Sequence, residues 1–595
     1  MAALPVTDPI AQRAAALIQD AFEDYNARFS DITRRARRGF ERRDWRRSQA
    51  DAVARIELFD AYLPEAMGRL EGLLEERIRS RAVWAAMRDA FAARIAALPD
   101  RALYETFFNS LSRRFFLTQG VAPRMEFHAL DSEPDGDAVC PGELLRHPAQ
   151  DDMAALWREI LAGHAFANGY ADLQGSARAI AGTIETRLAA HGEVPRAIEL
   201  LRTVFYRERR AYLVGRVEGA TQAWPLVVAL VSTAEGVRGD AVLTTADEMS
   251  MLFGYARSYF HADLARVGDA VAFLRGLLPL KPVDELYTVL GRAKQGKSER
   301  YRQVFRHLAA HPGERLVRAD GVRGMVMAVF TPRDHAVVFK VIRDRFAEPK
   351  TSARGDVEDK YKLVARRDRV GRLVDAQEFN RLRFPRALFD DDMLAELLRD
   401  CAETVALDGD EVLVRHCYVE RRLRPLDVYV REAAPDDALH AVLDYGLAIK
   451  DMAHSGIFPG DLLLKNFGVS RTRRALFYDY DELCLVEDCH FRKVPQVREE
   501  DETRPLDEWL YAARDDVFPE LFPPFLGLPA PLREALQRAH GEIFDAGWWS
   551  GVQARLRAGE YLDVAPYPDS VRIEDRRGPQ SLRDYRAIDA RSPTS

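Results

Sequence analysis

Most of the first half of the chain carries apolar residues at helical spacing. Over residues 10–116 they recur three or four positions apart, which places them on one face of a helix. Pro64 falls inside this region and predicts a break or kink. Helical patterns resume from 153 to about 213 and over 246–311, whereas residues 225–245 predict a β-hairpin with glycines in its turn.

Beyond residue 311 the pattern changes to short apolar runs, which predict strands. These runs cover residues 316–319, 325–330, 336–342, 411–420 and 475–478. Helical patterns cover about 357–382 and 434–453, and a hinge between two lobes is expected at 421–423. The chain is therefore predicted to be an α+β protein. We expect a mostly helical domain with a small β insertion over 1–311, a second domain over 312–576 and a tail over 577–595.

The composition is that of an ordinary globular protein. The chain has 595 residues, 47% of them hydrophobic, and a formal net charge of −7, whereas a dedicated nucleic-acid binder is usually basic. The most apolar run, 224–231, is too short to span a bilayer, and the acidic N-terminus lacks the pattern of a secretion signal. Five cysteines in so long a chain fit a reducing compartment. These features predict a cytoplasmic protein that binds neither nucleic acid nor membrane, and they leave its oligomeric state open.

The stretch over residues 458–482, FPGDLLLKNFGVSRTRRALFYDYDE, has the layout of a phosphoryl-transfer site. Such a site needs one carboxylate that orients the proton of the nucleophile. It also needs an amide oxygen and a second carboxylate that hold Mg²⁺ against the phosphates. Asp461, Asn466 and Asp479 can fill these roles in that order. A turn rich in Asp and Asn followed by a β-hairpin would bring the same residue types together without catalysis, so the stretch alone does not decide.

A glycine turn and a lysine ahead of this stretch favour the catalytic interpretation. Gly321 and Gly324 lie between the first two predicted strands, where they let the backbone approach a phosphate. Lys340 lies inside the apolar run VVFKVI, and a lysine in a buried strand is costly unless an anion pairs with it. The alternative is an edge-strand lysine that reaches water. Asp356 and Glu358 are candidate acidic partners, although the sequence does not establish a partner.

Three further patterns carry less weight. Cys140 and Arg146 have the C-x5-R spacing of a cysteine phosphatase loop, but the loop has one glycine and no buried strand precedes it, so we interpret the match as chance. Cys484 and Cys489 lie close together, but no second pair completes a four-ligand zinc site. Residues 485–520 are proline-rich and charged, which is typical of an exposed segment that contacts a macromolecular partner.

The order of these features, from glycine turn through strand lysine and hinge to Asp-x4-Asn and a later Asp, resembles that of protein kinases. The chain departs from the common pattern, because FPGD stands in place of HRD and the metal-binding segment reads DYD without a glycine. Together the blocks ADGVRGMVMAVF, VVFKVIRDRF, RDRVGRLVDAQEF, VRHCYVERR, FPGDLLLKNFGV and FYDYDE closely resemble the bacterial isocitrate dehydrogenase kinase/phosphatase family.

This resemblance implies a divergent bilobal protein-kinase-like fold after a mostly α-helical regulatory domain. It implies a bifunctional enzyme that phosphorylates a serine of NADP-dependent isocitrate dehydrogenase and also removes the phosphate. Phosphorylation would switch the dehydrogenase off and divert isocitrate from the tricarboxylic acid cycle into the glyoxylate bypass. The implied ligands are ATP and ADP with Mg²⁺ or Mn²⁺, and AMP as an allosteric effector near the junction of the two domains.

The resemblance also implies roles for individual residues. Asp461 is the expected kinase catalytic residue, Asn466 and Asp479 are the expected metal ligands, and Asp375 is tied to the phosphatase activity. The expected ATP-binding residues are Ala319, Asp320, Gly321, Val322, Arg323, Gly324, Met325 and Lys340. Apart from the C-x5-R match, the sequence shows no second catalytic set and no di-metal cluster for phosphatase chemistry, so dephosphorylation would have to reuse the kinase pocket.

Two other functions fit parts of the pattern. A small-molecule phosphotransferase of kinase-like fold shares the Asp-x4-Asn and the later Asp, although residues 485–520 and the large extra domain favour a protein substrate. A pseudokinase-like binding module would be expected to lack one of the residues Lys340, Asp461, Asn466 and Asp479, and the chain has all four.

Overall fold

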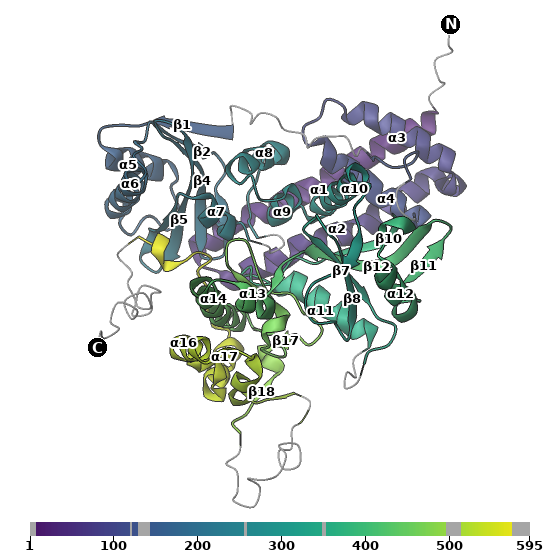
Figure 1. Cartoon of the computed structure of the whole chain (residues 1–595). Helices are drawn as coiled ribbons and strands as arrows, with labels where there is room; N and C mark the ends of the chain where they lie inside the picture. The colour runs from purple at the N-terminus through teal and green to yellow at the C-terminus, as the bar shows by residue number, and fades with distance from the viewer. Residues whose placement is uncertain are drawn as a thin grey trace, which may run out of the picture. The chain divides into compact units, whose positions relative to one another are not determined.

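The chain forms two compact units in a computed structural model that describes residues 8–118, 122–128, 143–254, 259–347, 353–494, 513 and 515–573 (Figure 1). The first unit runs to Gln303 and takes up the chain again at Ala565, and the second is Val304–Val564. Cys140, residues 495–512 of the proline-rich segment and the expected tail over 577–595 lie outside the described residues.

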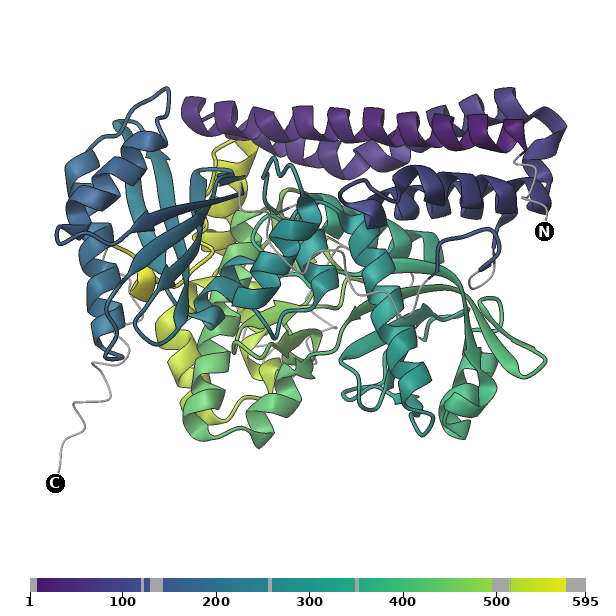
Figure 2. The same ribbon diagram turned by 90° about the horizontal axis from the view of Figure 1, so that it is seen from above.

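Four helices begin the first unit, as the apolar periodicity predicts. They are α1 (Pro9–Arg42), α2 (Trp45–Leu74), α3 (Arg81–Ile95) and α4 (Arg101–Phe116). Helices α1 and α2 pack against each other (Figure 2), and Phe22, Phe59 and Phe107 are buried in the core of the bundle. Pro64 lies within α2 and does not end the helix.

A six-stranded antiparallel sheet forms the next part of this unit, in the order β1-β2-β4-β5-β6 with β3 paired to β4. The strands are β1 (Leu144–Pro148), β2 (Ala197–Leu201), β3 (Phe205–Arg207), β4 (Arg210–Glu218), β5 (Ala223–Thr233) and β6 (Gly236–Leu243). Helices α5 (Met153–Gly163) and α6 (Leu173–Ala189) share a hydrophobic core with this sheet (Figure 1).

The predicted hairpin over 225–245 is confirmed as β5 and β6. The helix predicted as far as residue 213 is wrong beyond Ala189, where the chain forms β2, β3 and the start of β4. All five positions of β2 are buried, so its apolar run lacks the alternation that distinguishes a half-buried strand from a helix.

The first unit also contains α7 (Ala246–Leu252), α8 (Val267–Leu277), α9 (Val283–Val289) and the start of α10 (Ala293–Ala310). The chain returns to this unit after completing the second one. Tyr567 is buried, and its hydroxyl accepts a hydrogen bond from Nε of Arg210 at 3.0 Å. The backbone N–H of Ile573 donates to the carbonyl of Asp240 at 3.0 Å. These contacts place residues 565–573 with the first unit.

The second unit begins with a six-stranded antiparallel sheet in the order β10-β12-β9-β8-β7, with β11 paired to β12. The strands are β7 (Leu316–Arg318), β8 (Met327–Pro332), β9 (Val337–Ile342), β10 (Gln377–Pro385), β11 (Val405–Asp408) and β12 (Glu411–Arg421), and the helices are α11 (Arg354–Arg367) and α12 (Asp391–Asp400). The strands predicted at 316–319, 325–330, 336–342 and 411–420 are confirmed. The helix predicted over 357–382 is wrong beyond Arg367, because the chain goes on to form β10.

A mainly helical lobe completes the second unit. Its elements are β13 (Arg424–Pro425), α13 (Leu426–Glu432), α14 (Pro435–His454), β14 (Ile457–Phe458), β15 (Phe467–Val469), β16 (Ala475–Phe477), β17 (Cys484–Leu485), β18 (His490–Phe491), β19 (Asp516–Val517), α16 (Ala530–His540) and α17 (Ala546–Arg557). Helix α14 confirms the helix predicted over 434–453, and it buries Tyr445, Ile449 and Met452 in the core of this unit. Within the described ranges, no helix is long and apolar enough to cross a membrane.

Candidate active site

Asp461 lies on the short loop that follows β14. Its Oδ1 accepts hydrogen bonds from the backbone N–H of Leu463 at 3.1 Å and from the side-chain Nδ2 of Asn466. The Asp-x4-Asn spacing therefore corresponds to a direct contact between the two side chains. Burial raises the pKa of the Asp461 carboxyl; the Leu463 N–H opposes this shift, and the nearby carboxylate of Glu482 adds to it.

Asp479 follows β16 and lies beside this loop. The backbone N–H of Tyr478 donates to the carbonyl of Asn466 at 3.1 Å, which ties the two segments together. Burial, and then repulsion from Asp481, raise the pKa of Asp479 to about 7, while the positive charge of Lys340 opposes the shift. Asp461 also raises it, so several carboxylates act on one another in this region.

The donor atoms of this region suit Mg²⁺. Asp479 offers carboxylate oxygens, and Asn466 offers its amide oxygen because its amide nitrogen already donates to Asp461. A divalent cation would relieve the repulsion that raises the pKa of Asp479. No group of three or more His, Cys, Asp or Glu side chains in the described part of the chain could hold a metal ion. Mg²⁺ is usually bound through one or two carboxylates together with substrate phosphates.

Lys340 is buried in β9 and paired with a carboxylate of the neighbouring strand. Its Nζ lies 2.8 Å from Oε2 of Glu420 and donates to the carbonyl of Tyr478 at 2.6 Å. The edge-strand alternative is therefore wrong, since Lys340 is only 6% exposed. The candidate partners Asp356 and Glu358 are also wrong, because strand pairing places Glu420 of β12 on the same face as the lysine.

Asp375 lies beside the segment that carries Asp479. The residues just before Asp375 pair with β16. The N–H of Phe477 donates to the backbone carbonyl of Arg372 at 2.8 Å, and the N–H of Val374 donates to the backbone carbonyl of Phe477 at 3.1 Å. The hydroxyl of Tyr480 also donates to the carbonyl of Val374. Asp375 is 8% exposed and accepts a hydrogen bond from Nε2 of Gln377 at 2.9 Å.

A fully buried arginine holds this arrangement in place. The Nε of Arg372 lies 2.7 Å from Asp451, and its Nη1 lies 2.6 Å from Asp444. Burial lowers the pKa of Arg372, but the carboxylates of Asp444 and Asp451 raise it by more, so that the pKa lies above its ordinary value. Asp444 also accepts the backbone N–H of Ala475 at 2.6 Å, so the ion pairs fix the start of β16 and the segment leading to Asp375.

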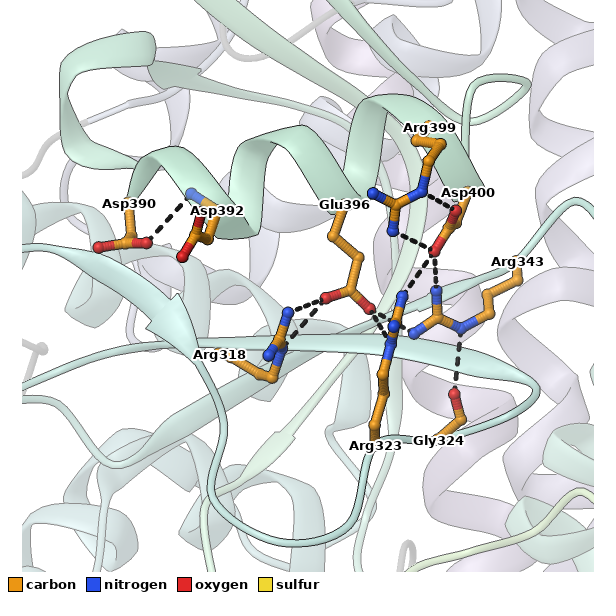
Figure 3. A network of polar contacts seen from close by, with 9 residues as sticks. All are labelled: Arg318, Arg323, Gly324, Arg343, Asp390, Asp392, Glu396, Arg399 and Asp400. Atoms are coloured by element: carbon orange, nitrogen blue, oxygen red, sulfur yellow. Dashed lines mark hydrogen bonds and ion pairs between the residues drawn. The ribbon is translucent and has the colours of Figure 1, made fainter.

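The turn between β7 and β8 is anchored to α12 by ion pairs. Figure 3 shows Arg323 of this turn together with Arg318 and Arg343. All three contact Glu396, and Arg323 and Arg343 also contact Asp400. Nε of Arg323 lies 3.0 Å from Glu396, and its Nη2 lies 2.9 Å from Asp400. The side chain of Arg323 is therefore engaged with α12.

The other side of the turn contacts the segment that links the two lobes. Asp320 lies 2.6 Å from Nη1 of Arg424. Gly321 has φ of 106°, a conformation that favours glycine, and a Cβ there would lie 3.1 Å from Pro425. Ala319 continues the β7 pairing, because its N–H donates to the carbonyl of Val329 at 3.1 Å. The expected ATP-binding turn is therefore fixed at both ends.

Three residues of the site were not predicted from the sequence: Glu420, Arg372 and Glu396. Each is a charged residue that the structure buries, with at most 2% of its surface exposed. Glutamate is rarely fully buried unless it is paired, so burial is not expected at Glu420 or Glu396 from the residue type alone. Their neighbours in the sequence do not indicate burial. Glu420 is paired with Lys340, 80 residues away, and Glu396 with Arg343, 53 residues away.

Comparisons with known proteins match both units. The model of the isocitrate dehydrogenase kinase/phosphatase (AceK) regulatory domain matches residues 15–312, and that of the kinase domain matches residues 314–569. The isocitrate dehydrogenase kinase/phosphatase of Xanthomonas euvesicatoria pv. vesicatoria (strain 85-10) is 51% identical over 576 residues, which covers 96% of this chain and 99% of the relative.

More distant relatives extend the same match. The isocitrate dehydrogenase kinase/phosphatase of Anaeromyxobacter sp. (strain Fw109-5) is 45% identical, covering 95% of this chain and 98% of the relative. The match to the kinase domain of a Toxoplasma gondii rhoptry antigen covers 41% of this chain and 83% of that chain at 10% identity, with a TM-score of 0.22.

Proposed function

Because the chain belongs to the isocitrate dehydrogenase kinase/phosphatase family, we propose that it phosphorylates a serine of NADP-dependent isocitrate dehydrogenase and removes that phosphate in the same pocket. It is a protein kinase and protein phosphatase that uses ATP and a divalent cation, and its protein substrate is isocitrate dehydrogenase. Through this reaction it controls flux between the tricarboxylic acid cycle and the glyoxylate bypass. The observation that supports a shared pocket is the contact of Asp375's segment with the segment that carries Asp479.

In the kinase direction, Asp461 orients the serine hydroxyl and accepts its proton. Its raised pKa makes it a stronger base than an exposed aspartate would be. Lys340, held by Glu420, neutralises charge on the ATP phosphates. Asn466 and Asp479 would hold Mg²⁺, which supplies further charge neutralisation at the phosphates.

The ATP phosphates would lie under the turn between β7 and β8. The ATP-binding residues are Lys340 and the residues of the turn, which are Ala319, Asp320, Gly321, Val322, Arg323, Gly324 and Met325. Val322 is 67% exposed, which keeps the tip of the turn open to an entering ligand. The ion pairs of Arg323 with Glu396 and Asp400 hold the turn in position.

In the phosphatase direction, Asp375 positions the water that receives the phosphoryl group. The phosphoserine would occupy the place of the ATP γ-phosphate beside Lys340. Gln377 donates to one carboxylate oxygen of Asp375, which fixes the orientation of the other. Family membership further supports AMP as an allosteric effector and a cytoplasmic location, where ATP and the dehydrogenase are both present.

The test is to mix the full-length protein with purified isocitrate dehydrogenase and Mg-ATP. Dehydrogenase activity should fall as phosphoserine appears on the dehydrogenase, and ADP with Mg²⁺ should restore activity after ATP is removed. AMP titrated into both assays should change the ratio of the two rates.

The control is Asp461→Asn, which preserves side-chain size and should show no loss of dehydrogenase activity. If label from ATP enters small molecules of a cell extract and not the dehydrogenase, the protein is a small-molecule phosphotransferase and the proposed substrate is wrong.

A further inference from the structure

Two cysteines lie side by side just after the segment that carries Asp479. The Sγ atoms of Cys484 in β17 and Cys489 are 3.4 Å apart, and both thiols are free. Between them lies the 3₁₀ turn η5 (Val486–Asp488). A disulfide bond is about 2.05 Å long, so a small shift of the two sulfurs toward each other would allow the bond to form.

The two thiols differ in access and acidity. Cys484 is half-buried, whereas Cys489 is only 3% exposed. The contact with the Cys489 sulfur lowers the pKa of Cys484, burial opposes this shift, and the positive charge of Lys360 adds to it. The same contact, with burial, raises the pKa of Cys489. A reachable, more acidic thiol beside a protected one is the arrangement of redox-sensing cysteine pairs.

The segment that holds Cys484 is bonded to the segment that leads to Asp461. In the pairing of β17 with β14, Cys484 lies opposite Phe458. The N–H of Val486 donates to the carbonyl of Gly456 at 2.9 Å. Gly460, next to Asp461, has no room for a side chain, since a Cβ there would lie 2.6 Å from the carbonyl oxygen of Glu482.

The Cys489 end of the turn is fixed from the other side. Nε2 of Gln553 in α17 donates to the carbonyl of Val486 at 2.8 Å and to that of Cys489 at 2.7 Å. When the sulfurs draw together, the Cys489 end is held by α17, so the adjustment falls on β17. Because β17 pairs with β14, that adjustment reaches the loop of Asp461.

We propose that Cys484 and Cys489 form a reversible peroxide-sensitive switch that lowers the activity of the pocket when they are joined. The Cys484 thiolate attacks hydrogen peroxide: an S–O bond forms, the O–O bond breaks, and hydroxide leaves to become water. The Cys489 sulfur then attacks the Cys484 sulfur, an S–S bond forms, and hydroxide leaves with the Cys489 proton as a second water. A dithiol restores both thiols.

The chain offers a direct test of the sulfur chemistry. Trypsin cleaves after Arg474 and Arg492, and residues 475–492 contain no other cleavage site, so both cysteines fall in one peptide. The full-length protein is treated with hydrogen peroxide, then with N-ethylmaleimide, and digested without reduction. We expect this peptide to lose two hydrogens and to carry no maleimide. A peptide with maleimide on both cysteines at saturating peroxide would overturn the proposal.

Activity is measured on the same samples, and this arm rests on the proposed role of Asp461. We expect peroxide to lower the kinase and phosphatase rates by at least about tenfold, since a misplacement of about 1 Å at a catalytic group costs on the order of a hundredfold, and dithiothreitol to restore both. Unchanged rates in a sample whose peptide shows the disulfide would overturn the switch. An enzyme inactive before oxidation would instead count against the proposed function, and the peptide mass would still decide the sulfur chemistry.

Variants separate the pair from other oxidation. Cys489→Val keeps an apolar side chain of similar size in a buried position, and it should abolish the disulfide and the reversible loss of activity. Cys484→Ser should do the same. Cys401→Ala, at another buried cysteine, should respond to peroxide as the unaltered protein does. Equal, reversible loss in Cys489→Val and in the unaltered protein would overturn the proposal.

Discussion

The ammonium group of Lys340 lies 2.8 Å from the carboxylate of Glu420, and the two residues belong to adjacent, hydrogen-bonded strands. Lys340 lies opposite Tyr418, so Glu420 is the next residue on the same face of β12. In protein kinases generally, the strand lysine pairs with a glutamate on a helix whose position controls activity. Here both partners lie in one sheet, so we expect that the activity of this enzyme is not controlled by forming and breaking this ion pair.

Lys340→Met should lower the phosphorylation rate of the dehydrogenase by orders of magnitude, because it removes a charge-assisted contact with the ATP phosphates. Glu420→Gln leaves the buried lysine without its counter-charge and should lower kcat/KM by about 10- to 100-fold, the equivalent of about 1.4–2.7 kcal/mol. The control is Glu378→Gln, at an exposed position of β10, which should retain full activity. Near-normal turnover by folded Lys340→Met would remove Lys340 from the site.

The raised pKa of Asp479 predicts that Mg²⁺ binding depends on pH near neutrality. Protons and Mg²⁺ compete for a carboxylate whose pKa is about 7, so the affinity should fall by nearly tenfold per pH unit below about pH 7. The measurement is a calorimetric titration of Mg²⁺ into the ADP complex between about pH 5.5 and about pH 8. Asp479→Asn should bind Mg²⁺ weakly and lose this pH dependence; an unchanged affinity would exclude Asp479 as a ligand.

The same carboxylate should make the metal-free protein less stable as the pH rises. Between about pH 4 and about pH 7 the unfolded state has released the proton of Asp479 and the folded state retains it, so the free energy of unfolding falls across this window. Asp479→Asn should therefore raise the melting temperature more at about pH 8 than at about pH 5. An equal change at both pH values would show that Asp479 ionises normally in the folded protein.

Glu396 should control the affinity for ATP through the turn between β7 and β8. Glu396→Gln keeps the side-chain volume but removes the charge that holds Arg318, Arg323 and Arg343 together. We expect KM for ATP to rise by about tenfold, which corresponds to about 1.4 kcal/mol, with a smaller change in kcat. Asp391→Asn alters an exposed carboxylate of the same helix and should leave KM unchanged. A fall in kcat alone would mean that the turn does not bind ATP.

Arg372 should be required for folding of the second unit. Arg372→Ala leaves the carboxylates of the partly buried Asp444 and the buried Asp451 without a counter-charge, at a cost of about 3–5 kcal/mol. Arg383→Ala removes an arginine whose acidic partners are exposed, and it should cost less than about 1 kcal/mol. Urea unfolding followed by tryptophan fluorescence, to which Trp548 and Trp549 of α17 contribute, measures both; equal effects would contradict the structural role of Arg372.

Local sequence features sufficed to predict much of the second unit. The strands around Lys340 and the helix α14 each depend on residues close in the chain. The strand β10 was predicted as a helix, because its alternation changes phase: Gln377 and Phe379 are buried before Arg381, and Leu382 and Phe384 after it. Arg381 has φ of 58°, and this left-handed residue resets which side chains face inward.

The pairing of Lys340 with Glu420 could not be predicted, for a different reason. It depends on the register of β9 against β12, whose residues are far apart in the chain. A shift of one residue would turn Glu420 to the opposite face, and that register is set by packing of the whole sheet. The cluster of Arg318, Arg323 and Arg343 around Glu396 could not be predicted either, because residues from separate elements come together only in the folded chain.

The two proposed activities should separate at two carboxylates of the pocket. Asp375 and Asp461 lie in different segments that both contact the Asp479 segment, since Val374 pairs with Phe477 and Tyr478 bonds to Asn466. Asp461 contacts Asn466 directly, whereas Asp375 is held by Gln377. In the proposed mechanism, Asp461 acts on the serine hydroxyl and Asp375 positions a water.

Asp375→Ala should therefore lose phosphatase activity and keep most kinase activity, whereas Asp461→Ala should lose kinase activity by about 100-fold or more, the contribution of a general base. Both variants are assayed on phosphorylated and unphosphorylated dehydrogenase, with and without ADP and Mg²⁺. Dephosphorylation by the unaltered enzyme should require both additions, because the phosphoserine uses the groups that bind ATP. Full phosphatase activity in nucleotide-free buffer would contradict a shared pocket. Equal loss of both activities in Asp375→Ala would instead mean that Asp375 supports the pocket as a whole and does not position the water.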